Sequence, residues 1–167
     1  MIHTFERKPI DPNRLYGLIV SESESLILIQ KEYDFEFDGF MVLRSRDITK
    51  QYTSDSNSYC EGIMREEGLW KDPPQWVCSI PLSDWRSVLT ALSGKPVVIE
   101  NERKGDFYIG PVVACEDHSV LIHFFDACGQ WQKIERVQYR TITSVKFGDR
   151  YSMIHYRHLP LPESVGK

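Results

Sequence analysis

Short apolar stretches rich in β-branched residues alternate with acidic or glycine-containing turns along most of the chain. Residues 15–20 and 25–30 are nearly continuous apolar runs on either side of the acidic turn 21–24. Runs of this length between turn residues are typical of strands, and the continuity of 25–30 indicates burial on both faces. In the first half the pattern predicts strands at 2–5, 15–20, 25–30, 33–38 and 40–44, with a tight turn at Asp38-Gly39.

The second half continues this pattern with longer strands. It predicts strands at 95–100, 106–115, 119–125, 130–138, 140–147 and 151–158. The dipeptide Gly110-Pro111 lies inside one of them, and both residues weaken a regular ladder. It therefore predicts a sharp bend or a bulge, a feature that barrels use at their corners.

The apolar positions change to a helical spacing at two places. Four apolar residues recur three and four apart, namely Trp85, Val88, Leu89 and Leu92. This stripe predicts a helix over 82–93, with Ser83 as its N-cap and Gly94 at its end. A second, shorter helix is predicted over 59–67.

The two halves of the chain resemble each other. Residues 17–20, an acidic turn and residues 25–29 match residues 110–113, an acidic turn and residues 119–122. The proline-containing segment 71–74 breaks regular structure between the halves and predicts a domain boundary. We therefore predict a mainly β protein of two small bent barrels in tandem, with one or two short helices. Its predicted parts are an N-terminal barrel (1–70), a linker (71–80), a C-terminal barrel with a leading helix (81–158) and a tail (159–167).

In the second half, the order of predicted elements is a helix followed by five short strands, with a glycine in the second strand. This order resembles the Sm-like fold. The resemblance is carried by the helix at 81–89, the strands at 94–99 and 107–114, and the turn and strand at 116–122. It covers residues 80–158, while residues 1–55 show it more faintly and without the leading helix. SH3-like barrels share such short bent strands, so the predicted barrels are Sm-like or SH3-like.

The Sm-like family is known for rings that bind short single-stranded RNA through two turns, so the resemblance implies RNA contacts in the matching turns. In the first turn Asp117 and His118 fit the family pattern, whereas Ser119 stands where the family has asparagine. In the second turn Arg140 is the one residue that matches the family's basic position. Because Sm-like domains associate by pairing exposed strand edges, the resemblance implies edge pairing, either between the two barrels of one chain or between copies in a homo-oligomer.

Charge refines this picture. The 167 residues carry 20 Lys and Arg against 24 Asp and Glu, a net charge of −4, which argues against nucleic-acid binding by charge alone. The balance is uneven, since residues 1–80 carry −5 and residues 81–167 carry +1. Basic and aromatic residues are interleaved in the last third, as single-stranded RNA surfaces require. The predicted RNA-binding set is Asp117, His118, Tyr139, Arg140 and Lys146.

A second candidate surface is acidic. Asp34, Glu36 and Asp38 recur at period two, so they share one face of a predicted strand. Three like charges can bind a cation or a basic partner, or they can form a solvated face. Together with the acidic first half, they favour a non-enzymatic interaction module that binds an unidentified protein. The alternative is a single-stranded RNA binder that uses the C-terminal barrel.

The sequence offers no catalytic or metal-binding constellation. Gly-x-Ser-x-Gly, P-loop and GxGxxG motifs are absent, and the histidines lack metal-ligand spacing, so no enzyme, metal or cofactor is expected. The four cysteines have no CxxC spacing, and no apolar run reaches the roughly 18 residues of a membrane span. We expect free thiols in a cytoplasmic protein without membrane contact.

Overall fold

Antiparallel pairing links the strands of the protein, whose computed structural model describes residues 1–160; residues 161–167 of the predicted tail lie outside the described residues. The strands are β1 (Ile2–Arg7), β2 (Asp11–Glu22), β3 (Leu26–Tyr33), β4 (Glu36–Arg44), β5 (Lys50–Tyr52), β6 (Pro96–Asn101), β7 (Asp106–Cys115), β8 (Ser119–Phe125), β9 (Trp131–Gln138) and β10 (Ser144–Phe147). The helices are α1 (Asp55–Glu66), α2 (Gln75–Cys78), α3 (Trp85–Ala91) and α4 (Arg150–His158). Two 3-10 turns are η1 (Ser45–Asp47) and η2 (Tyr139–Thr141).

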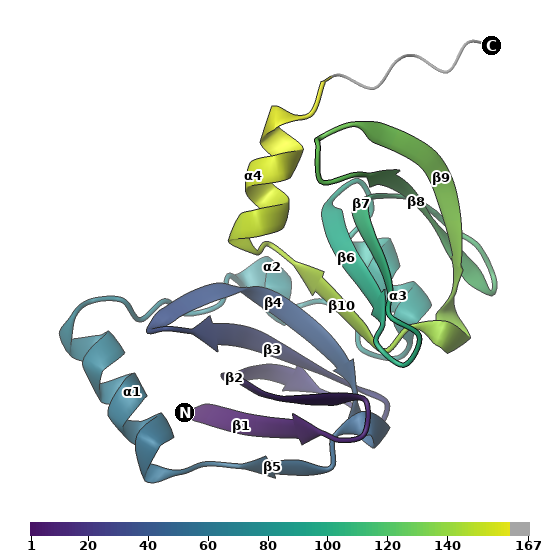
Figure 1. Cartoon of the computed structure of the whole chain (residues 1–167). Coiled ribbons are helices and arrows are strands. Elements are labelled where there is room, and N and C mark those ends of the chain that lie inside the picture. Colours follow the sequence, from purple (N-terminus) through teal and green to yellow (C-terminus); the bar gives the residue numbers. More distant parts are fainter. Residues whose placement is uncertain (161–167) are drawn as a thin grey trace.

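The sheet order, β5-β1-β2-β3-β4-β10-β6-β7-β8-β9, contains one five-strand arrangement twice (Figure 1). In the first run (β5-β1-β2-β3-β4) and the second run (β10-β6-β7-β8-β9), the last strand in sequence returns beside the first. The runs join where β10 pairs with β4. Within residues 1–160, β5 and β9 each have one neighbour, so neither run closes into a barrel. The mainly β prediction is confirmed, and the ten strands form one open sheet.

The segments after η1 and η2 repeat the same hydrogen bonds. In the first run, the backbone N–H and the hydroxyl of Thr49 donate to the Glu6 carbonyl at 2.8 and 3.0 Å. In the second run, the same two groups of Thr143 donate to the Glu100 carbonyl at 2.8 and 3.0 Å. The likeness of the two halves therefore extends from the sequence to the backbone geometry.

In each run one glycine lets a strand pack closely on its neighbour: Gly17 of β2 on β3, and Gly110 of β7 on β8. A Cβ built on Gly17 would lie 2.6 Å from the Gln30 carbonyl oxygen, and one on Gly110 would lie 1.9 Å from the His123 carbonyl oxygen. A bulge follows each glycine, and in β7 it falls between Val112 and Ala114. The predicted irregularity in 106–115 is thus present, just beyond Gly110-Pro111.

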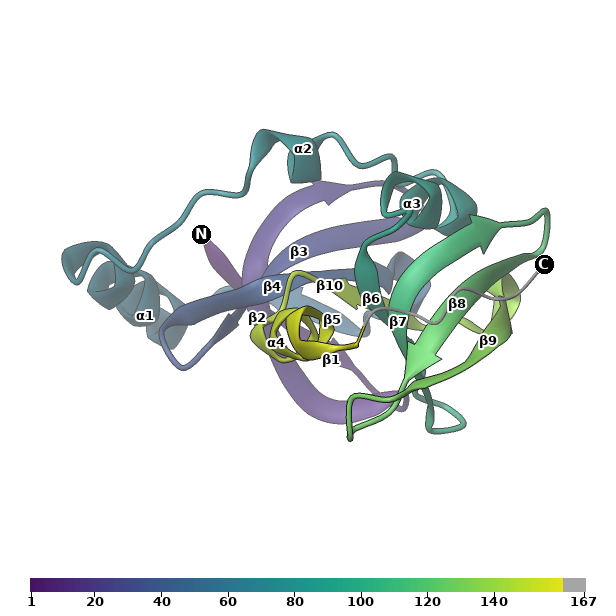
Figure 2. The same cartoon turned by 90° about the horizontal axis from the view of Figure 1, so that it is seen from above.

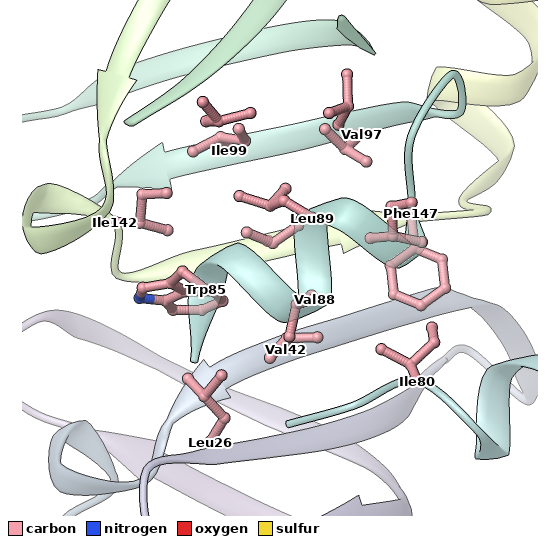
Figure 3. Close-up of a cluster of buried hydrophobic side chains, with 14 of the residues drawn as sticks. Leu26, Val42, Ile80, Trp85, Val88, Leu89, Val97, Ile99, Ile142 and Phe147 are labelled. Carbon is pink, nitrogen blue, oxygen red and sulfur yellow. The ribbon is translucent and has the colours of Figure 1, made fainter. Parts of the chain in front are cut away.

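One hydrophobic core spans both runs, with α3 at its centre (Figure 3). Trp85, Val88 and Leu89 of α3 are buried against Val42 of the first run and Ile99 of the second. Each such side chain contributes about 1.5–3 kcal/mol on burial. The predicted helical stripe is confirmed. The N-cap is Asp84 rather than Ser83.

Helices α3 and α4 lie on opposite faces of β6, as the view in Figure 2 illustrates. Val97 and Ile99 of β6 join the core around α3, whereas Val98 joins a smaller cluster that Tyr156 of α4 packs against. Neighbouring strand residues point to opposite faces, so this alternation places one helix on each side. The two faces therefore offer separate surfaces for function.

The predicted strand at 151–158 is wrong, because these residues form most of helix α4. Gly148 follows β10 with a φ of +70°, a value that favours glycine. Asp149 then caps the helix by accepting the Ser152 N–H at 3.0 Å and the Ser152 hydroxyl at 2.7 Å. This local capping signal outweighs the weak apolar alternation of the segment.

The tight turn predicted at Asp38-Gly39 lies instead at Asp34-Phe35. These two residues have φ of +53° and +64°, the left-handed geometry that two-residue hairpin turns need. Gly39 lies within β4, where a Cβ would approach the Asp149 nitrogen to 2.5 Å. Its role is close packing against the segment before α4 rather than a turn.

Three further segments differ from the predicted boundaries. The helix predicted over 59–67 begins earlier, because Ser54 caps it. The strand predicted over 140–147 divides into η2 and β10. The segment 71–80 contains α2, whose Val77 is fully buried in the core. Part of the segment between the runs is therefore packed into the fold.

A buried ion pair also ties the runs together. Arg7, at the end of β1, is only 1% exposed and donates to both carboxylate oxygens of Glu102, at 2.5 and 3.2 Å. Glu102 follows β6 and also accepts from the Thr143 hydroxyl. Burial alone would raise the pKa of Glu102, but hydrogen bonds from Arg7 and Thr143 outweigh it and lower that pKa. The carboxylate is thus held in its charged form between the two runs.

Candidate nucleic-acid interface

Four turns and the start of α3 meet on one surface, which we call the loop face. It comprises the β2–β3 turn, η1, the β7–β8 turn, η2 and residues 83–86. Within each run the two turns are joined by one backbone bond. The Ser45 N–H donates to the Ser25 carbonyl at 2.9 Å, and the Tyr139 N–H donates to the His118 carbonyl at 3.1 Å. The repeated fold therefore builds this surface from equivalent parts.

An open groove of about 440 Å³ crosses the loop face where the runs meet. It is lined by four arginines, two aspartates and two aromatic residues: Arg44, Arg46, Arg86, Arg140, Asp84, Asp117, Trp85 and Tyr139. Two further hollows, of about 320 and 520 Å³, share lining residues with it on either side. Along this track the four arginines outnumber the three carboxylates, those of Asp84, Asp117 and Glu24, although the whole chain has a net charge of −4.

The two aspartates of the groove are already engaged. Asp84 accepts the Ser87 N–H at 2.7 Å as the cap of α3, and this bond lowers the pKa of its carboxyl. Asp117 forms an ion pair with Arg86 at 3.2 Å. Both side chains of this pair are more than half exposed, so it is a weak surface contact. Neither aspartate is paired with Arg46 or Arg140.

Arg46 and Arg140 are the available cations. Among residues 1–160 neither forms an ion pair, although the Arg140 Nε donates to the Gln138 Oε1 at 2.7 Å. Arg44 differs, because it is buried and bound to Asp47. The two available arginines are the central residues of η1 and η2, so the repeat places one at each side of the junction.

Aromatic and imidazole rings accompany these cations. Tyr139 lies half-buried in the groove, and its hydroxyl donates to the Glu116 carbonyl at 3.0 Å. Burial and the neighbouring Cys115 raise the pKa of Tyr139, so the phenol stays neutral. His118 is exposed beside Tyr139 and Arg140. Flat rings next to guanidinium groups suit the stacking of unpaired bases.

The structure brings together four of the five predicted RNA-binding residues. Asp117, His118, Tyr139 and Arg140 all lie on the loop face. Lys146 does not: it lies in β10, and its Nζ donates to the Glu100 Oε1 at 3.0 Å. Its neighbours in β10 are buried in the core around α3, so alternation points Lys146 to the opposite face of the sheet.

Arg44, Arg46 and Arg86 are functional candidates that the sequence prediction missed. The internal repeat held a signal for one of them. Residues 47–49 match residues 141–143, and extending this match by one position places Arg46 opposite Arg140. The η1 and η2 turns confirm that equivalence. Arg86 had no such signal, because it depends on how α3 packs.

The predicted acidic set does not form one row on a strand. Asp34 occupies the hairpin turn, whereas Glu36 and Asp38 lie in β4. Glu36 forms an ion pair with Arg150 at 2.9 Å, and Asp38 Oδ1 accepts the Arg150 N–H at 2.8 Å. The role of these residues in binding a protein stays a prediction.

The described part of the chain also bears on metal binding, reactive thiols and membrane-spanning helices. In residues 1–160, no group of three or more His, Cys, Asp or Glu side chains is placed to hold a metal ion. The four cysteines are free, and burial together with Glu32 raises the pKa of the Cys60 thiol to about 11. None of the helices in this part is both long and apolar enough to span a membrane.

Comparison of the chain with family models, with curated proteins and with solved structures finds no match.

Proposed function

We propose that the protein is a non-enzymatic module that binds single-stranded RNA on the loop face. The observation that carries this proposal is the pair Arg46 and Arg140, which have no carboxylate partner among residues 1–160 and occupy equivalent turns beside one groove. Exposed guanidinium groups bind phosphates, and the nearby rings of Tyr139 and His118 offer stacking surfaces for bases. Two of the four arginines of the groove, Arg86 and Arg140, come from residues 81–167, which carry a net charge of +1 against −5 for residues 1–80 and are therefore the half better suited to a polyanion.

The strand order supports a finer fold proposal, in which each run is an Sm-like unit that remains open. The second run follows helix α3, as the Sm-like order requires, whereas the first run begins directly with β1. The two RNA-contacting turns implied by that resemblance correspond to the β7–β8 turn and to η2. Four free thiols agree with a reducing compartment, and we keep the cytoplasm as the proposed location.

Neutralising Arg46 and Arg140 should weaken RNA binding. The Arg46→Gln/Arg140→Gln double variant removes both available cations and leaves the Asp84 and Asp117 contacts intact. We expect its affinity for a labelled oligouridylate of about twelve nucleotides to fall by roughly tenfold or more. Fluorescence anisotropy over a salt series should show a slope in log Kd against log salt that is lower by about 0.7 per lost phosphate contact.

Lys133→Gln provides a control with the same change of charge per site. Lys133 is 82% exposed at the end of β9 away from η2, so its loss should leave RNA affinity unchanged. Equal RNA affinity of the wild type and the double variant, or an equal loss with Lys133→Gln, would contradict the assignment of the loop face.

The β4–β10 junction also supports a proposal for self-assembly. In the sheet order each run has two end strands. The first run begins with β5 and ends with β4, and the second run begins with β10 and ends with β9, so β5 is equivalent to β10 and β4 to β9. The free β5 of one copy can therefore pair with the free β9 of the next, as β10 pairs with β4 within the chain. Such a head-to-tail contact produces a ring or a filament.

A charge placed at the β9 edge should reduce this assembly. Ile134 is 47% exposed on β9, and Ile134→Lys introduces an unpaired charge at the proposed contact, which protects strand edges against pairing. We expect light scattering to give an oligomer for the wild type and a monomer for Ile134→Lys. Val113→Lys, equally exposed on the inner strand β7, should retain the oligomer. A wild-type monomer at all concentrations contradicts the proposal.

A further inference from the structure

A second groove, of about 580 Å³, lies away from the loop face, between the β3–β4 hairpin and α4. We call it the hairpin groove. Its apolar lining comes from Tyr33 and Phe37 of the hairpin and from Tyr151 and Ile154 of α4. Helix α4 lies on the face of β6 opposite α3, so this groove is separate from the proposed RNA surface.

The apolar side chains of this groove are unusually exposed. Tyr33 is 69%, Tyr151 53% and Ile154 43% accessible to solvent. Tyr151 and Ile154 lie three apart on α4, so they share one side of the helix and face the hairpin. Three large apolar side chains gathered around one hollow mark an interaction site more often than three scattered over a surface.

The rim of the hairpin groove is acidic. Asp34 at the hairpin tip forms no ion pair within residues 1–160, and only one oxygen of Asp38 accepts a hydrogen bond. Glu36 pairs with Arg150, but both side chains are more than half exposed, and such surface pairs contribute only about 0–1 kcal/mol. Lys31, with its Nζ 5.8 Å from the Tyr33 ring centre, is a second nearby cation, and Lys146 beyond it is paired with Glu100. His155 also lines the groove. With His155 counted as neutral, the three carboxylates of Asp34, Glu36 and Asp38 outnumber the two cations Arg150 and Lys31.

We propose that the hairpin groove binds a short basic segment of another protein. An apolar side chain of that segment would fit between Tyr33, Tyr151 and Ile154, and its Lys or Arg residues would reach Asp34 and Asp38. The sign of the charge opposes a nucleic acid here. A second copy of the chain, related by a two-fold axis, would bring the same carboxylates against each other, which is also unfavourable.

Two labelled peptides of about twelve residues test this proposal by fluorescence anisotropy. One alternates Lys with Leu and the other alternates Glu with Leu, so their apolar content is matched. The wild type should bind the Lys-Leu peptide and not the Glu-Leu peptide. The Tyr151→Ser/Ile154→Ser variant and the Asp34→Asn/Asp38→Asn variant should each bind the Lys-Leu peptide about tenfold more weakly.

Matched controls lie on α1, outside the groove. Tyr59→Ser removes a ring that is 68% exposed, and Glu66→Gln removes an exposed carboxylate, so both should bind the Lys-Leu peptide as the wild type does. The groove variants should bind oligouridylate normally, which separates this proposal from the RNA proposal. Unchanged peptide affinity in the groove variants, equal binding of both peptides, or a wild-type dimer that Tyr151→Ser/Ile154→Ser dissociates would overturn it.

Discussion

Gly110→Ala should destabilise the fold by about 3 kcal/mol or more, a large part of the roughly 5–15 kcal/mol that holds a domain folded. The new Cβ would lie 1.9 Å from the His123 carbonyl oxygen, which is backbone in the paired strand β8. A flexible side chain could move away, but this oxygen cannot move without opening the β7–β8 ladder. Gly17→Ala meets the Gln30 oxygen at 2.6 Å in the first run, so it should destabilise in the same direction by less.

Urea unfolding followed by circular dichroism measures these differences. Gly62→Ala is the control, because Gly62 lies within α1 and a Cβ there meets nothing within 4 Å. Alanine is favoured over glycine inside a helix by about 0.5–1 kcal/mol, so this variant should be equal to or more stable than the wild type. A Gly110→Ala protein as stable as the wild type would show that β7 and β8 are not packed as described.

Local patterns predicted most strands and α3, but they could not predict how the runs join. β10 inserts between β4 and β6, and this pairing connects residues that lie far apart in the sequence. Each predicted half was expected to close on itself, whereas the antiparallel contact with β4 extends the sheet. Helix α4 was missed for a different reason. Its signal is the Asp149 cap, while the apolar residues after it fit a strand as well as a helix.

The candidate site was likewise predicted only as far as local sequence patterns allow. The sequence placed Asp117, His118, Tyr139 and Arg140 in two turns, and these turns do meet. Lys146 was included because it is one of the basic residues interleaved with aromatic ones in the last third of the chain, but period-two alternation directs it to the other face of the sheet. The contribution of the first run, above all Arg46, depends on the junction between runs. A sequence read as two independent domains does not reveal a groove shared by both.

Glu102→Leu should cost about 3–5 kcal/mol, because it leaves the buried Arg7 without its main partner. Asp11, at 3.3 Å from Arg7, is the remaining carboxylate, and the Arg7 Nε is already buried without a partner. Replacing both residues, as in Arg7→Met/Glu102→Leu, removes the buried charge as well as its partner. We expect the double variant to recover most of the lost stability in urea unfolding. Equal losses in the single and double variants would mean that Glu102 acts through packing rather than charge.

Acid should remove the contribution of this ion pair. The pKa of Glu102 in the fold lies below its ordinary value of 4.5, so the folded state releases that proton more readily than the unfolded chain does. Its stabilisation is therefore fully present above about pH 4.5 and is lost as the pH falls through the lowered value. The stability of the wild type relative to Arg7→Met/Glu102→Leu should decline over that interval and stay constant from about pH 6 to 7. A stability difference that does not change on acidification would show that Glu102 is not held in its charged form by Arg7.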